Sequence, residues 1–206
     1  LPAKKDPVWE PVMGIRYMHQ VWASGAGTGK EGGWQIVAYE NPNENRLALP
    51  YSQMTIKRQI CLPKDAGEII EKLSAAGFEA FAVGGCVRDS VIGREPGDWD
   101  ITTSATPQQV KALFKRTIDT GIKHGTVTVM MHHVGYEVTT YRMDGEYEDH
   151  RHPDHVDFTD DLIEDLKRRD FTINAMAYNP AVGIVDAFDG MGDLEIGVIR
   201  CVGEAE

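Results

Sequence analysis

Cysteine, long apolar stretches and surplus basic charge are all scarce in this sequence of 206 residues. The three cysteines, Cys61, Cys86 and Cys201, are an odd number without a C-x-x-C pair, which argues against a disulfide framework or a structural zinc knuckle. No apolar run approaches the roughly 20 residues of a membrane span. Lys4 and Lys5 interrupt the N-terminus, so no signal peptide is expected. Together these absences predict a soluble protein of the reducing cytoplasm.

The charge balance is acidic, with 21 basic and 32 acidic residues and a formal net charge of −11. The first 53 residues contain five of each kind, so the whole excess lies from Met54 onward. Affinity for a nucleic-acid backbone comes mostly from Lys and Arg, and this composition therefore disfavours a general nucleic-acid binder. Phosphates can still be bound where metal ions neutralise carboxylates.

Residues 1–53 show no sustained periodicity and are interpreted as an unassigned, loop-rich segment, with Trp34–Tyr39 as a strand candidate. Gly27–Lys30 looks like part of a phosphate-binding loop. However, Ser24 stands where the first glycine of that motif belongs, and Glu31 follows the lysine. An ordinary loop is therefore favoured.

Residues 54–206 are regular and are predicted to form one α/β domain, a mixed sheet flanked by helices. Helices are expected at 66–76, at 86–92, from Thr106 onward, and in a segment containing Phe171, Ala175 and Tyr178. Strands are expected at 78–83, 98–102, 126–132, 136–142, 184–186 and 198–202. The strands at 126–132 and 136–142 are predicted to form an antiparallel hairpin through His133–Gly135.

Asp98 and Asp100 are the first candidate catalytic residues. Alternate residues of a strand share a face, so the two carboxylates project together and repel each other unless a cation lies between them. Mg²⁺ prefers such oxygen ligands. Glu137 lies between apolar neighbours in a β-rich run and is a candidate third carboxylate of a two-metal site. An exposed turn explains the Asp pair alone, and a salt bridge to Lys or Arg explains Glu137 alone.

Gly84 and Gly85 follow the first long strand directly. Glycine lets the backbone approach a phosphate, and Arg88 lies one turn further along the chain. The alternative is an ordinary tight turn with a surface arginine. A third group, Arg169, Asp170 and Asn174, is predicted to converge within one helical turn, combining a cation for phosphate with polar groups for a ribose.

The order of these motifs resembles the nucleotidyltransferase superfamily. FAVGGCVRDSVIGREPGDWDITTSATPQQV, HGTVTV, YEVTTYR, DHRHPDHVDF and RRDFTINAMAY closely resemble the head domain of class II tRNA nucleotidyltransferases, the CCA-adding enzymes, which bacterial poly(A) polymerases share. The resemblance covers about 61–203. It implies a nucleotidyltransferase head with a mixed sheet.

The resemblance also implies roles for individual residues. Asp98 and Asp100 match the metal-binding pair for Mg²⁺, which Mn²⁺ can replace, and Glu137 matches the third catalytic carboxylate. The implied nucleotide-binding residues are Gly84, Gly85, Arg88, Asp89, Arg142, Arg151, Arg169, Asp170 and Asn174. Residues 143–159 resemble the catalytic loop. Their histidines, at 150, 152 and 155, fit no standard zinc motif.

The implied reaction is transfer of CMP and AMP from CTP and ATP to the 3′ end of tRNA. Two features depart from the family pattern: residues 1–53 have no counterpart, and the sequence reaches Glu206 before the E-D-x-x-R segment that selects between C and A. A poly(A) polymerase head that adds AMP to RNA 3′ ends is the closest alternative. An inactive nucleotide-binding remnant is a second alternative of another class.

Overall fold

A computed structural model of the chain describes residues 35–36, 54–143 and 156–203. The helices are α2 (Lys64–Ala75), α3 (Gly85–Val91), α4 (Pro107–Leu113), α5 (Leu162–Lys167) and α6 (Gly190–Ile196), with 3₁₀ turns η2 (Ile122–His124) and η3 (Thr172–Asn174). The strands are β1 (Gln35–Ile36), β2 (Thr55–Ile56), β3 (Ala80–Val83), β4 (Ile101–Thr103), β5 (Thr117–Gly121), β6 (Thr126–Met131), β7 (Val134–Thr140), β8 (Arg142–Met143), β9 (Asp157–Phe158), β10 (Met176–Asn179), β11 (Gly183–Asp186) and β12 (Val198–Ile199). The phosphate-loop-like segment at 27–30 lies outside the described residues.

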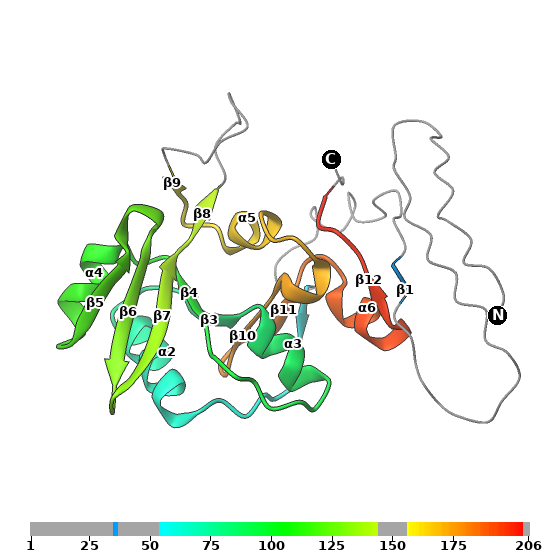
Figure 1. Cartoon of the computed structure of the whole chain (residues 1–206), viewed down its shortest axis with the longest axis horizontal. Helices are drawn as coiled ribbons and strands as arrows, with labels where there is room; N and C mark the ends of the chain where they lie inside the picture. The colour runs from blue at the N-terminus through cyan, green and yellow to red at the C-terminus, as the bar shows by residue number, and fades with distance from the viewer. Residues whose placement is uncertain (1–34, 37–53, 144–155, 204–206) are drawn as a thin grey trace, which may run out of the picture.

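The centre of the fold is an eight-stranded sheet in the order β2-β11-β10-β3-β4-β7-β6-β5. Neighbouring strands run antiparallel except β4 and β7, which are parallel. The sheet is therefore mixed, and the predicted α/β fold with flanking helices is confirmed. The single parallel pair lies near the middle of the sheet, where it brings two segments far apart in sequence side by side (Figure 1).

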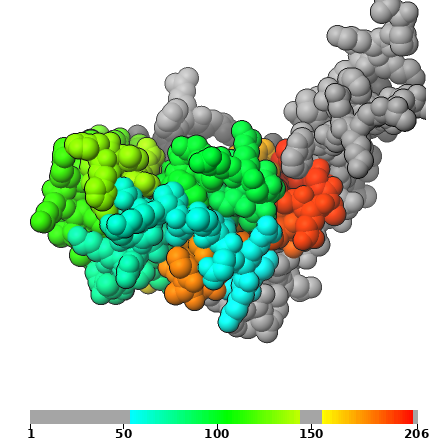
Figure 2. Space-filling model, turned by 90° about the horizontal axis from the view of Figure 1, so that it is seen from below, coloured from blue at the N-terminus to red at the C-terminus, as the bar shows by residue number. Residues whose placement is uncertain are grey.

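Side chains of β3 alternate between two hydrophobic clusters, one on each face of the sheet. Ala80 and Ala82 pack with the apolar face of α2, where Ile69 and Leu73 are fully buried. Phe81 and its neighbour Val83 pack on the other face with α5. Figure 1 shows α2 and α5 on opposite sides of the sheet, and Figure 2 shows the segment that contains α2, in cyan, on the near surface of the molecule when it is seen from below.

Two local predictions from the sequence are confirmed. Thr106 caps α4 in a reciprocal capping box with Gln109, and Pro107 is the first helical residue. Strands β6 and β7 form the antiparallel hairpin, but its turn lies one residue earlier than predicted. His132 and His133 occupy the turn with φ of 45° and 72°.

Two other predictions need correction. Residues 171–178 do not form the expected helix. They form the short 3₁₀ turn η3 and then most of strand β10, whose residues are all buried. Strand β4 begins at Ile101, so Asp98 and Asp100 lie in the segment that leads into it. The buried strand shows no alternation, and the spacing of Phe171, Ala175 and Tyr178 fits a helix by coincidence.

The boundary after residue 53 stays a prediction. All strands of the eight-stranded sheet come from 54–203, whereas Gln35–Ile36 pairs in parallel with β12 in a separate two-stranded sheet. In the part of the chain that the structure describes, no helix is both long enough and apolar enough for a bilayer span.

Candidate active site

The two aspartates and Glu137 meet at the parallel pair of the sheet. Ile101 of β4 pairs with Val138 of β7. Asp100 and Glu137 each precede one of these paired residues, so they enter the sheet at the same level on adjacent strands. Asp98 lies two residues further back. The predicted gathering of three carboxylates from distant parts of the sequence is therefore present.

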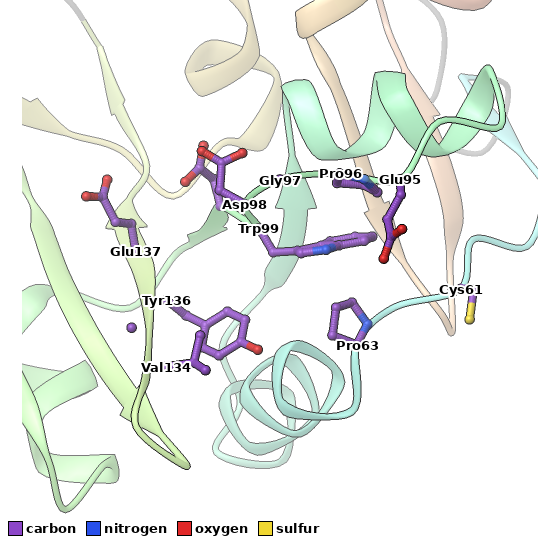
Figure 3. A pocket seen from close by; sticks show the side chains of 12 residues that line it. Cys61, Pro63, Glu95, Pro96, Gly97, Asp98, Trp99, Val134, Tyr136 and Glu137 are labelled. Carbon is purple, nitrogen blue, oxygen red and sulfur yellow. The ribbon is translucent and has the colours of Figure 1, made fainter.

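Asp100 and Glu137 project to the same face of the sheet. Ile101 and Val138 point into the core cluster beneath α2, so their neighbours in sequence project to the opposite face. Figure 3 shows the carboxylates of Asp98 and Glu137 on one side of the chain, and the ring of Trp99 directed away from them. An open pocket of about 680 Å³ is lined by all three acidic residues.

Burial and neighbouring negative charge both act on Asp100. Its pKa is raised, first by partial removal of the carboxylate from water and then by the negative charges of Asp98 and Glu137, with Arg169 acting in the opposite direction. Among the ion pairs between described residues, none involves Glu137. The salt bridge considered for Glu137 from the sequence is therefore not found in this part of the chain.

This donor set suits a hard cation that keeps part of its own shell. Within the described ranges, no three His, Cys, Asp or Glu side chains form a ready-made metal cage. Mg²⁺ is usually held by one or two carboxylates, with water and substrate phosphate completing its octahedron. The repulsion around Asp100, which Arg169 offsets only in part, fits such an ion.

Two arginines, Arg88 and Arg169, lie beside the turn between β3 and α3 and are called the cationic group below. Gly84 adopts φ of 83° and ψ of −131°, a conformation essentially restricted to glycine. An alanine Cβ at this position would lie 3.0 Å from Nη1 of Arg169. The bare backbone at Gly84 thus makes room for the guanidinium, while Gly85 begins α3.

Arg88, Asp89, Asn174 and Asp170 form a continuous hydrogen-bonded chain next to that turn. Nε of Arg88 donates to Asp89 at 2.9 Å, and Nη1 donates to the side-chain oxygen of Asn174 at 2.6 Å. The amide of Asn174 in turn donates to Asp170 at 3.3 Å. The predicted convergence of Asp170 and Asn174 therefore occurs, but Asn174 ends a 3₁₀ turn and Asp170 precedes that turn, so no α-helix is involved.

Arg169 links the cationic group to the carboxylates. Its pKa is lowered by desolvation first, against the stabilising charges of Asp165 and Asp100. The backbone brings the same regions together, because the N–H of Val83 donates to the carbonyl of Asp100 at 3.0 Å and that of Gly84 donates to Met176 at 3.1 Å. Arg169 and the acidic residues around Asp100 consequently lie within electrostatic reach of each other.

Two of the nucleotide-binding candidates are not placed in this group. Arg142 has other partners: its Nη1 donates to the carbonyl of His124 at 2.6 Å, and its backbone N–H donates to Asp165 at 3.2 Å. Arg151 lies outside the described residues, as do His150, His152 and His155.

Sequence reasoning missed Asp165, which is fully buried beneath Arg169. The signal was available in the spacing, since Asp165 precedes Arg168 by three residues and Arg169 by four, the two spacings that bring side chains together on a helix. Its partner Thr102 is 63 residues away in sequence and carries no such signal.

Cys86 lies under the Gly84 turn and is expected to be chemically silent. Burial raises the pKa of its thiol to about 11, whereas Cys61 and Cys201 are exposed. Only the thiolate reacts, so a disulfide reagent at pH 8 should modify two thiols in the native chain and three in denaturant. Cys61→Ser is the control and should leave one reactive thiol. Rapid modification of three thiols without denaturant would contradict this assignment.

Comparison with known proteins identifies the fold family. The family described as "Poly A polymerase head domain" matches residues 80–200. The chain belongs to this family. The head domain is 56% identical to the CCA-adding enzyme of Lactiplantibacillus plantarum over 141 residues, which cover 68% of this chain and 35% of that enzyme. The CCA-adding enzyme of Leuconostoc mesenteroides is 56% identical over 142 residues, or 69% and 35% of the two chains.

Solved structures agree with this assignment. The Bacillus stearothermophilus CCA-adding enzyme in complex with CTP is 46% identical, with a TM-score of 0.62, over 68% of this chain and 33% of that one. The Thermotoga maritima CCA-adding enzyme complexed with tRNA is 25% identical, with a TM-score of 0.53, over 74% and 35%. The chain thus spans about a third of the length of the relatives it matches.

Proposed function

We propose that this head domain catalyses the transfer of CMP and AMP from CTP and ATP to the 3′ end of tRNA. One observation carries the proposal: the carboxylates of Asp98, Asp100 and Glu137 lie next to the cationic group that contains Arg169. The names of the relatives support the tRNA reaction over poly(A) synthesis, because both similar enzymes and both similar structures are CCA-adding enzymes.

In this proposal Asp98 and Asp100 hold Mg²⁺, or Mn²⁺ in its place, and Glu137 completes the acidic wall. The metal, when bound, activates the attacking hydroxyl and neutralises developing charge on phosphate. Arg88 and Arg169 hold the triphosphate, and Asp170 and Asn174 face the ribose. The 3′ hydroxyl of the acceptor attacks the α-phosphate, and pyrophosphate leaves. The three free cysteines fit the cytoplasm as the compartment.

A head-swap chimera tests this function. It joins residues 54–206 to the C-terminal remainder of the L. plantarum enzyme, whose own head is 56% identical. We expect the chimera to add CCA to a tRNA that lacks it and to leave a poly(A) primer unextended. A folded chimera that adds nothing, beside an active parent enzyme, would contradict the proposal. Extension of the poly(A) primer alone would favour the polymerase alternative.

The chain by itself is expected to bind CTP and ATP with similar affinity, within about threefold. The residues assigned here contact the triphosphate and the ribose, and none of them reads the base. Calorimetric titration with each nucleotide in the presence of Mg²⁺ measures this, with inorganic triphosphate as the control for contacts that need no base. A strong preference for one nucleotide would show that the head selects the base itself.

A further inference from the structure

The buried carboxylate of Asp165 contacts both Arg169 and the strand that follows Asp98 and Asp100. Asp165 of α5 is fully buried, and burial of an unpaired carboxylate is costly, so its partners define its role. Thr102 donates to it at 3.0 Å, the backbone of Arg142 at 3.2 Å and Nε of Arg168 at 3.0 Å. Nη2 of Arg169 lies 3.7 Å away.

These partners come from three segments of the chain. Thr102 is on β4, two residues after Asp100 and on the same face of the sheet. Arg142 begins β8, and Arg169 carries the guanidinium that lies against Gly84. The side chain of Asp165 therefore anchors α5 to β4, the strand that follows Asp98 and Asp100. The same side chain fixes the position of Arg169 relative to that strand.

Charge balance shows what Asp165 prevents. Arg168 and Arg169 are adjacent and repel each other, and Asp165 is the main charge that favours the cationic form of Arg169. The next carboxylate that acts on Arg169 is Asp100. Loss of the Asp165 charge would therefore remove the carboxylate that lies 3.7 Å from Arg169 and leave Asp100 as the main negative charge acting on the guanidinium.

We propose that Asp165 is a positioning residue for the nucleotide site: it holds Arg169 beside Gly84 for the triphosphate and away from Asp100. This inference rests on the proposed function, because it takes the phosphates of CTP as the group that Arg169 binds. It assigns no contact between Asp165 and the substrate. It predicts instead that losing its charge weakens phosphate binding beyond any loss of stability.

Asp165→Asn in the full chain tests the proposal by calorimetric titration with CTP and with inorganic triphosphate, both with Mg²⁺. Both affinities should fall by about tenfold or more, since hydrogen bonds to charged groups are the strong ones. The two losses should be equal, because Arg169 acts on phosphate and not on the base.

Asp186→Asn is the matched control. Asp186 is also fully buried, and its carboxylate accepts hydrogen bonds from the backbone N–H groups of Gly190 and Met191. The substitution should lower Tm and leave CTP affinity unchanged.

A second pair of variants tests the proposal if Asp165→Asn does not fold. Thr102→Val removes one hydrogen-bond donor to Asp165 and should lower the affinity for CTP about threefold. Thr140→Val, the control, removes a buried hydroxyl that donates to the carbonyl of Ala105 and should leave the affinity for CTP unchanged. CTP affinity unchanged in Asp165→Asn, or in Thr102→Val, would overturn the positioning role while leaving the proposed function intact. A wild-type chain that binds neither CTP nor triphosphate would overturn both.

Discussion

Asparagine in place of Asp100 is expected to abolish nucleotidyl transfer and to leave the head folded. The substitution keeps the shape of the side chain but removes one of the two charges that we assign to the metal. Charge stabilisation by a bound metal is worth several kcal/mol, so kcat should fall by about three orders of magnitude. The measurement is single-turnover addition of CMP by the head-swap chimera. Turnover within a few-fold of the parent would exclude the assignment of Asp100.

The same variant should be more stable than the parent at neutral pH. Because the pKa of Asp100 is raised, the folded state binds its proton more tightly than the unfolded state does. The stabilisation from this group is thus complete below the unfolded pKa of about 3.9 and is lost as the pH rises through the folded pKa. At pH 7 the ionised Asp100 therefore opposes folding, and asparagine relieves that cost.

Thermal melts from pH 3.5 to pH 8 check this expectation. The Tm of Asp100→Asn should exceed that of the parent near pH 7, and the difference should vanish toward the acid end. Asp119→Asn is the control, because Asp119 is an exposed aspartate paired with Lys111 at 2.8 Å and should show no gain. Adding Mg²⁺ should raise the Tm of the parent and not that of Asp100→Asn. A lower Tm for Asp100→Asn at pH 7 would mean that Asp100 supports the fold.

Elements with one buried face could be predicted from the sequence. The stripe of Ile69, Ile70 and Leu73 marks α2, and the capping residues mark the start of α4. Strands β5 and β10 gave no usable pattern: β5 is an edge strand with its middle residues exposed, and β10 is buried on both faces. Neither alternates, so period-two reasoning fails for both.

The site was predictable where residues are close in sequence or belong to a recognisable motif. Asp98 and Asp100 are two residues apart, and Asp170 and Asn174 are four apart, so each pair is close in sequence, although neither pair lies on the strand or helix that was expected. Placing Glu137 beside Asp100 required the parallel pairing of β4 with β7, which no local pattern encodes. The same is true of Asp165 and Thr102, whose contact depends on how α5 packs over the sheet.

Alanine at Gly84 is expected to damage both the fold and nucleotide binding. Its φ of 83° disfavours any side chain, at a cost of about 1–3 kcal/mol, which for a domain of this size lowers Tm by about 3–10 °C. The new Cβ would also lie 3.0 Å from Nη1 of Arg169. The guanidinium would have to give by a few tenths of an ångström, and we expect this shift to lower the affinity for CTP by a few-fold.

Gly77→Ala separates the two effects. Gly77 has a similar φ of 89° at the end of α2, but a Cβ there would meet nothing within 4 Å. It should therefore lose stability through backbone strain alone and keep the CTP affinity of the parent. Melts and calorimetric titrations of both variants in the full chain make the comparison. The contradicting result would be that Gly84→Ala loses no more stability than Gly77→Ala and binds CTP with the affinity of the parent. The contact between Gly84 and Arg169 would then have no role in holding the triphosphate.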